Sequence, residues 1–433
     1  MLKKLVILLT FAFIFSLSAE DKIYFVTKEK DAGKAAAEKA GGKWAKSLTK
    51  AFAWAGRDFE EKKETNVIIK VAQGEYSGDL GSGAYQMPLY DNPKESLKIE
   101  GGYNKDFTAR KPFATPSKIV TIKERSAVLI SFTKKSKLKS FVMDGIIMDA
   151  QNSNNYDSKS NSLLKRGSST WGYLSFQYLE TDHLGFNNCV FMNAAHTVMA
   201  PLIRAATPNC TIKYYNCIFL NNVIPIKLEA AGFRNMPKNI TVDHCSFLLN
   251  WALNPDPNTG NPAALEIGNK YGAKEIIITN NLFYANFGGA IMALSKFPPP
   301  MTVNNNNFVG NGLLHGQTAS EAVAMIVSAG GRKQPIDIDT IEDVAFIDEA
   351  EDNVSIPPGI PLSLGKAKPI DINEVKVKEG WENQVRGILG LNLQGTSVKV
   401  SDYAPKKDYD PTKPPFATDE KAKKYGASAA LVK

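Results

Sequence analysis

Charged side chains suited to acid–base chemistry recur beside a short apolar stretch that appears several times in the chain. Four of them, Arg204, Lys227, Glu229 and Glu266, are expected at outward or near-outward positions of successive repeats. Lys or Arg can act as a base that removes a proton, and Asp or Glu can hold Ca²⁺. These residues form one candidate catalytic or ligand-binding cluster, and a solvated charged surface is the alternative.

A hydrolase would instead need two or three Asp side chains in a tight group. Asp182 and Asp243 lie nine and four residues before the Phe of their repeats, so we expect them in different columns. His183 and His244 each follow one of these Asp residues, which suggests a catalytic pair. His244 also replaces the Asn that begins other copies of the repeat, and this structural role is the favoured interpretation.

Aromatic side chains in three inserted segments are the other binding candidates. The segments cover roughly residues 151 to 175, 229 to 238 and 251 to 262, and they contain Trp171 and Trp251. Loops on a rigid scaffold commonly carry binding residues. These tryptophans could stack on sugar rings or insert into a neighbouring subunit, or they could seal the flank of the fold, and both interpretations stay open.

A repeated phrase indicates the elements that position these residues. Asn188-Cys189-Val190-Phe191 returns 28 residues later at Asn216, and again 28 residues later at His244. Related copies begin at Asn280 and Asn305, at spacings of 36 and 25. Internal repeats of this length are typical of stacked coils.

Each copy follows an alternating β-branched run, such as Ile240-Thr241-Val242, and precedes the second apolar stretch, so one coil holds two or three short strands. Because a single coil cannot bury its apolar side alone, each strand should pair in parallel with its equivalents above and below. Equivalent residues then form columns. We expect an internal aromatic column of Phe191, Phe219, Phe247, Phe283 and Phe308, and an Asn column of Asn222, Asn250, Asn286 and Asn311.

These motifs resemble the right-handed parallel β-helix of the pectate-lyase-like superfamily, over roughly residues 60 to 345. The resemblance implies an all-β solenoid with an N-terminal amphipathic helix as a cap and an extended C-terminal tail. A strand at 23–26 and a helix across residues 31 to 56, with apolar Trp44 and Phe52 at helical spacing, fit the cap. The ending Tyr425-Gly426-Ala427 is similar to closing segments that pack back on the body in this superfamily.

The chain begins with Lys3 and Lys4, an apolar run from Leu5 to Phe15 and a small-residue region ending at Ala19, which is typical of a secretory signal peptide. No second apolar segment is long enough for a transmembrane helix. We therefore expect an exported protein that is periplasmic, surface-located or secreted. The expected divisions are 1–19 signal, 20–60 strand and capping helix, 61–345 β-helix, and 346–433 β-helix end and tail.

Cysteine spacing and charge limit the remaining possibilities. Three of the four cysteines share one repeat column, which predicts buried thiols, with a disulfide between neighbouring coils as the alternative. No Cys or His spacing typical of a metal site is present, so no metal is expected. The net charge of +8 favours acidic partners, and no nucleic-acid-binding motif occurs.

The sequence thus favours an exported non-catalytic scaffold that binds a glycan or a neighbouring protein in an envelope, surface or filament-sheath assembly. The alternative is a polysaccharide lyase or hydrolase acting on an acidic polysaccharide. No cofactor is expected for the scaffold, whereas a lyase would use Ca²⁺. The superfamily resemblance does not decide between them, because it includes lyases, hydrolases, esterases, adhesins and structural proteins.

Overall fold

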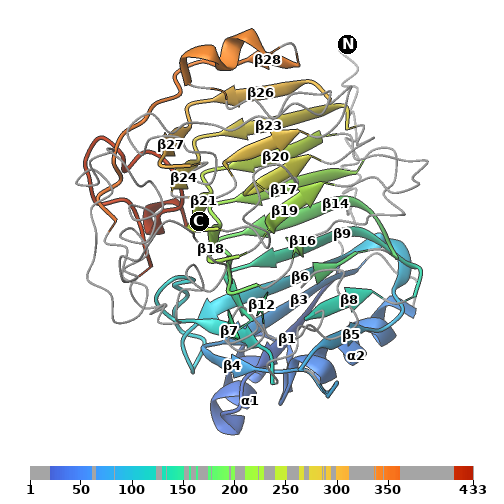
Figure 1. The fold of residues 1–433 in the computed structure, drawn as a ribbon. Coiled ribbons are helices and arrows are strands. Elements are labelled where there is room, and N and C mark those ends of the chain that lie inside the picture. Colours follow the sequence, from blue (N-terminus) through green and yellow to red (C-terminus); the bar gives the residue numbers. More distant parts are fainter. Residues whose placement is uncertain are drawn as a thin grey trace, which may run out of the picture.

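The computed structural model consists mostly of long all-parallel sheets with few helices (Figure 1). It describes residues 20–60, 65–81, 83–122, 129–132, 134–150, 156–157, 162–163, 174–176, 178–194, 197–199, 210–222, 224–228, 239–250, 263–267, 273–284, 286, 289–293, 299–311, 336, 338–344, 346–360 and 414–432. No helix within these ranges combines the length and the apolarity needed to cross a bilayer.

Sheet A has eleven strands and is the largest. Its strands are, in order across the sheet, β2 (Lys43–Ala45), β1 (Glu20–Val26), β3 (Thr65–Ala72), β6 (Asp91–Tyr103), β9 (Ser136–Asp144), β14 (Leu179–Asn187), β17 (Thr211–Tyr215), β20 (Asn239–Asp243), β23 (Glu275–Thr279), β26 (Met301–Asn304) and β28 (Ile347–Glu349).

Sheet B has eight strands and sheet C has seven. Sheet B contains β27 (Asn307–Val309), β24 (Leu282–Tyr284), β21 (Ser246–Leu248), β18 (Ile218–Leu220), β15 (Val190–Met192), β10 (Ile146–Asp149), β7 (Ser117–Val120) and β4 (Gly74–Tyr76). Sheet C contains β25 (Ile291–Ala293), β22 (Leu265–Ile267), β19 (Ile224–Leu228), β16 (Thr197–Met199), β13 (Leu174–Ser175), β8 (Ile130–Phe132) and β5 (Tyr85–Met87). A separate antiparallel pair joins β11 (Tyr156–Asp157) to β12 (Ser162–Leu163).

Consecutive strands enter the three sheets in turn, so that β14, β15 and β16 form one coil and β17, β18 and β19 form the next. This arrangement is consistent with a parallel β-helix. The turn from sheet A to sheet B requires a left-handed backbone, with φ of 52° at Asn188, 53° at Asn216, 51° at His244 and 58° at Asn280. Asn tolerates this conformation better than most residues, which explains why it begins the repeat phrase.

The predicted aromatic column is confirmed. Phe219 is paired in register with Phe191 below and Phe247 above, and all three are fully buried. The ring centroids of Phe219 and Phe247 are 4.8 Å apart with an interplanar angle of 5°, and Phe283 and Phe308 continue the stack. The rings therefore run through the core at the spacing of the strands.

The predicted Asn column is also confirmed, at the turn from sheet B to sheet C. The Asn250 side-chain amide donates to Asn286 Oδ1 at 2.8 Å and to the Phe219 carbonyl at 3.1 Å. Its own Oδ1 accepts from the Asn222 backbone N–H at 3.0 Å. The buried amide of Asn250 thus satisfies polar groups on the coils below and above it, which a buried turn requires.

A second inner column changes residue type along the stack. Its lower members are Cys189, Cys217 and Cys245, and the next is Asn281. Cys217 Sγ donates to the Phe186 carbonyl at 3.3 Å, and Asn281 Nδ2 donates to the Val242 carbonyl at 2.9 Å. All four cysteines of the chain are buried free thiols, as the favoured prediction stated. Burial raises the pKa of Cys189 and Cys217 well above the usual thiol value.

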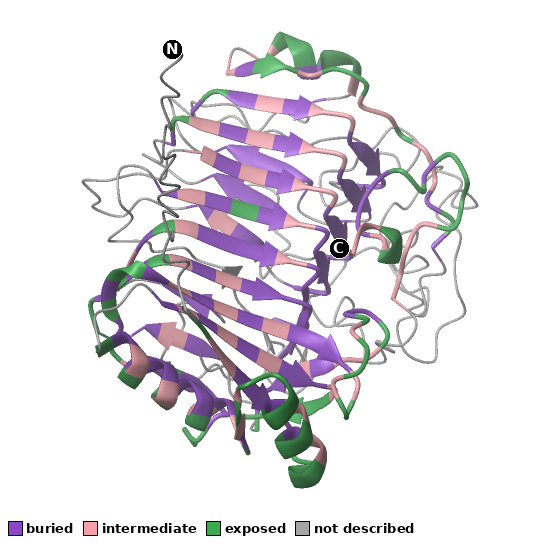
Figure 2. Cartoon of the chain, turned by 180° about the vertical axis from the view of Figure 1, so that it is seen from behind, coloured by how far each residue is buried: buried purple, intermediate pink, exposed green. Residues whose placement is uncertain are grey.

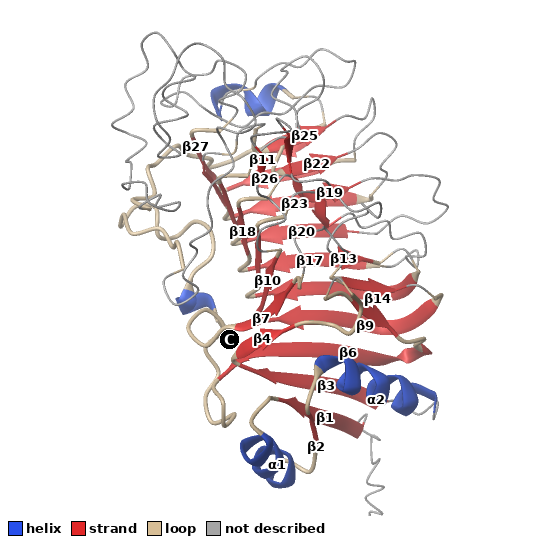
Figure 3. Cartoon of the chain, turned by 60° about the horizontal axis from the view of Figure 1, so that its bottom comes forward, coloured by secondary structure: helices blue, strands red, loops and turns tan. Residues whose placement is uncertain are grey.

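The N-terminal region corrects the prediction of one helix across residues 31 to 56. There are two helices, α1 (Lys30–Lys39) and α2 (Leu48–Glu60), and Trp44 lies between them in β2. The chain leaves α1 through Gly41, where φ is 65°, so the helical spacing of apolar residues does not continue. The Phe52 ring of α2 packs edge-on against Tyr85 with centroids 5.6 Å apart, so α2 joins the core at this end of the stack (Figure 3).

The C-terminal segment 414–432 packs against the stack and includes the short helix η6 (Ala429–Leu431). Gly426 N–H donates to the Asn280 carbonyl, and Ala427 N–H donates to Ser246 Oγ, both at 2.8 Å. Ser428 exchanges two hydrogen bonds with the Asn216 side chain, at 2.7 and 3.0 Å. Three successive residues therefore contact three successive coils.

Candidate functional site

The structure brings two of the sequence candidates together. Lys227 in β19 and Glu266 in β22 are register partners, and Lys227 Nζ lies 3.4 Å from Glu266 Oε1. The Glu266 side chain is only 6% exposed, against 26% for Lys227. Glu266 is therefore a buried, paired carboxylate rather than part of a solvated surface. The other four candidates, Arg204, Glu229, Trp171 and Trp251, lie outside the described residues.

The outer faces of sheets A and B differ strongly in exposure (Figure 2). From β10 to β27 the strands of sheet B are buried on both sides, and Ile218, Leu248 and Leu282, which point away from the Phe column, are fully buried. Strands of sheet A alternate, and Thr241 in β20 is partly exposed between buried Ile240 and Val242. The outer face of sheet A is thus open to a partner along much of its length.

Outward side chains on sheet A form two rows because the strands pair in register. The first row, near the turn into sheet B, is Glu100, Asp144, Asn187, Tyr215, Asp243, Thr279 and Asn304. The second row is Lys98, Val142, Lys213, Thr241, Ile277 and Thr302, and it is interrupted between Val142 and Lys213 by Gly185, which has no side chain. Neighbouring members of a row are separated by about 4.8 Å, the distance between paired strands.

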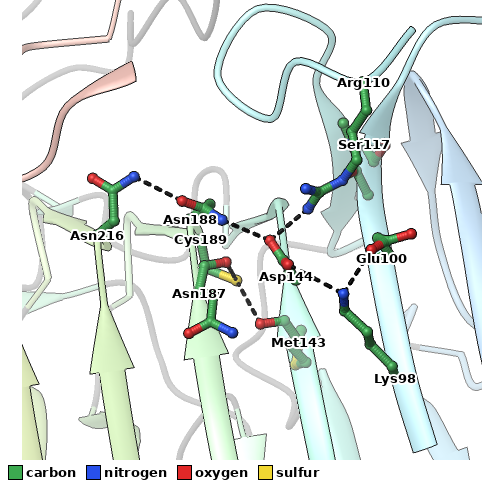
Figure 4. Close-up of polar contacts among 12 residues, drawn as sticks. Lys98, Glu100, Arg110, Ser117, Met143, Asp144, Asn187, Asn188, Cys189 and Asn216 are labelled. Atoms are coloured by element: carbon green, nitrogen blue, oxygen red, sulfur yellow. Dashed lines mark hydrogen bonds and ion pairs between the residues drawn. The ribbon is translucent and has the colours of Figure 1, made fainter. Parts of the chain in front are cut away.

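A lower cluster on these rows consists of Lys98, Glu100, Arg110 and Asp144 (Figure 4). Lys98 Nζ lies 2.6 Å from Glu100 Oε1 and 3.5 Å from Asp144 Oδ2. Arg110 reaches in from the loop after β6, donates through Nη2 to Asp144 Oδ1 and donates through Nε to the Gly101 carbonyl. Two cations and two carboxylates therefore neutralise one another.

The two carboxylates of the lower cluster serve the fold. Burial would raise the pKa of Glu100, but hydrogen bonds from Lys98 and Tyr103 outweigh it and leave this pKa below its usual value. Asp144 accepts from Asn188 Nδ2 at 2.8 Å, and Asn188 Oδ1 accepts from Asn216 Nδ2 at 2.7 Å (Figure 4). The side-chain amides of Asn216 and Asn188 therefore form a ladder on the outer side of the turn, and this outer amide ladder ends on Asp144.

The same arrangement occurs at the turn from sheet B to sheet C. Asn221 Nδ2 donates to Asn193 Oδ1 at 2.9 Å, and Asn193 Nδ2 donates to Asp149 Oδ1 at 2.8 Å. Lys118 Nζ lies 3.5 Å from Asp149 Oδ2. Both outer amide ladders thus end on a carboxylate that a cation neutralises, and this pattern indicates a structural role for Asp144 and Asp149.

An upper cluster lies on β17 and β20 and contains Lys213, Tyr215, Asp243 and His244. His244 Nδ1 lies 2.7 Å from Asp243 Oδ1, and Asn280 Nδ2 donates to the same oxygen at 2.9 Å. The Lys213 ammonium lies 4.9 Å from the centroid of the Tyr215 ring, which also meets the His244 ring edge-on at 5.9 Å. All four side chains are partly or fully exposed.

The surroundings of the upper cluster lower the pKa of Asp243 and of the nearby His183. Burial would raise the pKa of Asp243, but the hydrogen bonds from His244 and Asn280 and the charge of Lys213 outweigh it, so this pKa is lowered. On the neighbouring coil His183 Nδ1 lies 2.9 Å from Thr211 Oγ1. Burial and the nearby Lys213 lower the pKa of His183. The upper cluster therefore presents the Asp243 carboxylate and the Tyr215 ring beside Lys213, and His183 lies on the neighbouring coil.

This combination can do two things chemically. An aromatic ring flanked by carboxylate, amide, imidazole and ammonium groups can pack against a sugar ring and hydrogen-bond its hydroxyls. An imidazole oriented by a carboxylate can also act as a general base, with the phenol of Tyr215 nearby. Within the described residues no group of three or more His, Cys, Asp and Glu is arranged to hold a metal ion.

Sequence reasoning noticed His244 but missed the cluster around it. The left-handed backbone of His244 matches the Asn positions of the turn, as expected, while its side chain pairs with Asp243. Lys213 and Tyr215 were available from the alternation of Thr211-Ile212-Lys213-Tyr214-Tyr215, because the buried residues Ile212 and Tyr214 leave the other three outward. The pairing in register then places Tyr215 beside Asp243.

Comparison of the chain with protein-family models, curated proteins and solved structures finds no match in any of the three.

Proposed function

We propose that the protein is an exported, non-catalytic β-helix scaffold that binds a glycan on the outer face of sheet A, centred on the upper cluster. The observation that carries this proposal is the open row at Tyr215, where an aromatic ring is bordered by Lys213, Asp243 and His244. The outer face of sheet B and the Glu266 carboxylate on sheet C are buried and offer less to a polymer in solution.

The internal pairing of charge supports a binding role over a catalytic one. The carboxylates of the lower cluster are neutralised by Lys98 and Arg110, and Glu266 is paired with Lys227. A catalytic base must accept a proton from the substrate, and a cation ligand must bind the cation. These charged groups instead stabilise one another and the ends of the turn ladders. A glycan lying along the row would meet one coil about every 4.8 Å, so several coils could contribute to one site.

The finer features of the fold belong to the same proposal. We infer a right-handed stack that begins after residue 60, with residues 20–60 as its cap and the segment beyond 346 as its closing end and tail. The packing of α2 against the core supports the cap, and the contacts of Gly426, Ala427 and Ser428 support a tail that returns to the body. A chain without residues 20–60 should aggregate, and a stable monomer would contradict the cap.

A glycan-binding panel tests the function. Neutral and acidic polysaccharides would be compared by affinity electrophoresis and calorimetry for the wild type, for Tyr215→Ala and for Tyr178→Ala, which removes an exposed Tyr outside the cluster. Tyr215→Ala should weaken binding roughly tenfold, a loss of about 1.4 kcal/mol, and Tyr178→Ala should leave it unchanged. Absence of binding, or equal losses in both variants, would contradict the site.

The second candidate is a lyase acting on an acidic polysaccharide, and the Asp243–His244 pair favours it. In that case His244 would remove the ring proton and Lys213 would lie beside the substrate carboxylate. Incubation with uronate polymers, with and without Ca²⁺, would reveal unsaturated products by their ultraviolet absorbance. We expect no product. Product formation that His244→Gln abolishes would establish the lyase, whereas loss with Lys227→Ala would place the centre on sheet C.

A further inference from the structure

The two ends of the stack carry opposite charge. At one end lie the 3₁₀ helix η3 (Ile338–Asp343), strand β28 and the turn that follows. The described residues between 336 and 360 include no Lys or Arg, and seven of their carboxylates are exposed: Asp339, Glu342, Asp343, Asp348, Glu349, Glu351 and Asp352. No ion pair neutralises these seven groups within the part of the chain that the structure describes.

The opposite end is basic. Here α1 packs against edge strand β2, and a side-chain carbon added at Gly33 would lie 2.1 Å from Trp44 Cδ1, so the helix sits directly on the strand. Seven lysines between residues 28 and 50 are exposed: Lys28, Lys30, Lys34, Lys39, Lys43, Lys46 and Lys50. Three exposed carboxylates accompany them, which leaves a net charge of +4 over these residues.

Sheet A connects the two ends without a change of direction. β2 and β28 are the edge strands of the sheet, and every pairing between them is parallel. Ten strand spacings separate them, which corresponds to about 48 Å. A second copy shifted along this axis without rotation therefore places its basic edge beside the acidic edge of the first copy, with strands running the same way.

We propose that the protein associates end to end with copies of itself, the α1–β2 end of one copy against the η3–β28 end of the next. The seven exposed carboxylates repel one another, and the lysines of a second copy relieve that repulsion. The contact is head-to-tail, so each added copy leaves the same two ends free and the assembly grows as a filament rather than closing as a dimer. This inference deepens the scaffold proposal by naming one protein partner.

Salt dependence is the first test, with the full exported protein. Sedimentation velocity would be compared at about 0.01 M salt, where the screening length is roughly 30 Å, and at about 1 M, where it is roughly 3 Å. We expect species larger than a monomer that increase with protein concentration at low salt and disappear at high salt. A monomer under all conditions would overturn the proposal.

Charge reversal identifies the surfaces. One variant carries Lys30→Glu, Lys34→Glu and Lys39→Glu on α1, and the other carries Glu342→Lys, Asp343→Lys and Asp348→Lys. The first variant should stay monomeric, because both of its ends are then acidic. The second should lose most of its association, because three of the seven exposed carboxylates at its acidic end are replaced by lysines. A mixture of the two should regain association between the unaltered acidic end of the first variant and the unaltered basic end of the second. Circular dichroism and thermal unfolding confirm that each variant is folded.

A matched control separates the ends from net charge. Lys134→Glu, Lys135→Glu and Lys139→Glu change the same number of exposed lysines beside and within β9, in the middle of the stack. This control should associate like the wild type. An equal loss of association in the control, or no rescue on mixing, would overturn the proposal. The glycan panel is independent, so failure of either proposal leaves the other measurable.

Discussion

The outer faces of sheets A and B are built on strands of the same stack yet differ in what they leave for a partner. On sheet B, Ile218 lies outside the Phe219 column and is as fully buried as Phe219 itself. On sheet A, Ile277 occupies the corresponding outward side and is partly exposed. The difference shows that sheet B from β10 to β27 is covered on both sides and serves stability, whereas sheet A is covered on one side and can serve recognition.

The largest expected effect concerns the core that both faces share. Phe219→Ala should destabilise the protein by about 3–5 kcal/mol, because it removes a ring packed between Phe191 and Phe247 and leaves a cavity in the column. Denaturant unfolding measures the change. A loss below about 1 kcal/mol would mean that the column is not the principal core of sheet B.

A matched pair of substitutions tests the comparison directly. Ile218→Ala on the outer face of sheet B should cost about 2–4 kcal/mol, because the side chain is fully buried. Ile277→Ala makes the same change on the outer face of sheet A and should cost about 1 kcal/mol or less, because that side chain already contacts water. Equal losses in the two variants would break the distinction between the faces.

The C-terminal segment supplies a smaller effect. Gly426 has φ of 77°, and a side-chain carbon there would lie 2.4 Å from Ser246 Oγ and 2.8 Å from Leu282 Cβ. Gly426→Ala should therefore weaken the docking of this segment on sheet B and cost about 1–3 kcal/mol. Increased binding of an apolar dye would report the uncovered face. Gly81→Ala, where no atom lies within 4 Å, is the matched control and should leave dye binding unchanged.

The smallest effect is a pH dependence on sheet A. Because the pKa of His183 is lowered in the folded protein, the unfolded state binds a proton first as pH falls. The contribution of His183 to stability is therefore fully present above its unfolded pKa of about 6.5 and is lost as pH falls toward the folded value. His183→Gln should flatten the decline in unfolding free energy between about pH 7 and 5. An unchanged slope would show that His183 is equally basic in both states.

Much of the fold was predictable because each repeat contains the strands, the turn residues and the core residues of one coil. The 28-residue interval predicted the coils, and the recurrence of Phe and Asn predicted the columns that the structure confirms. The break between α1 and α2 was missed because Trp44 keeps helical spacing while Gly41 takes a left-handed backbone. The apolar spacing continues across Gly41 and Gly42, so it does not reveal the break that these glycines introduce.

The polar contacts that connect separate segments were less predictable than the coils, because their partners lie far apart in the chain. Arg110 reaches Asp144 across 34 residues, and Ser428 reaches Asn216 across 212. Neither pairing leaves a local signal. One signal was available, however: the continuous apolar runs at 190–192 and 218–220 indicate strands buried on both sides, whereas alternation at 240–242 indicates one open side. This contrast separates the covered face from the open one.

The crossing of the C-terminal segment over three coils has a mechanical consequence. The strands lie side by side along the stack, so a force pulling the two ends apart loads their hydrogen bonds in tension and could separate the coils one at a time. The C-terminal segment opposes this separation through Gly426, Ala427 and Ser428. These residues are hydrogen-bonded to the coils that carry Asn280, Ser246 and Asn216. The segment therefore distributes such a load over three coils at once.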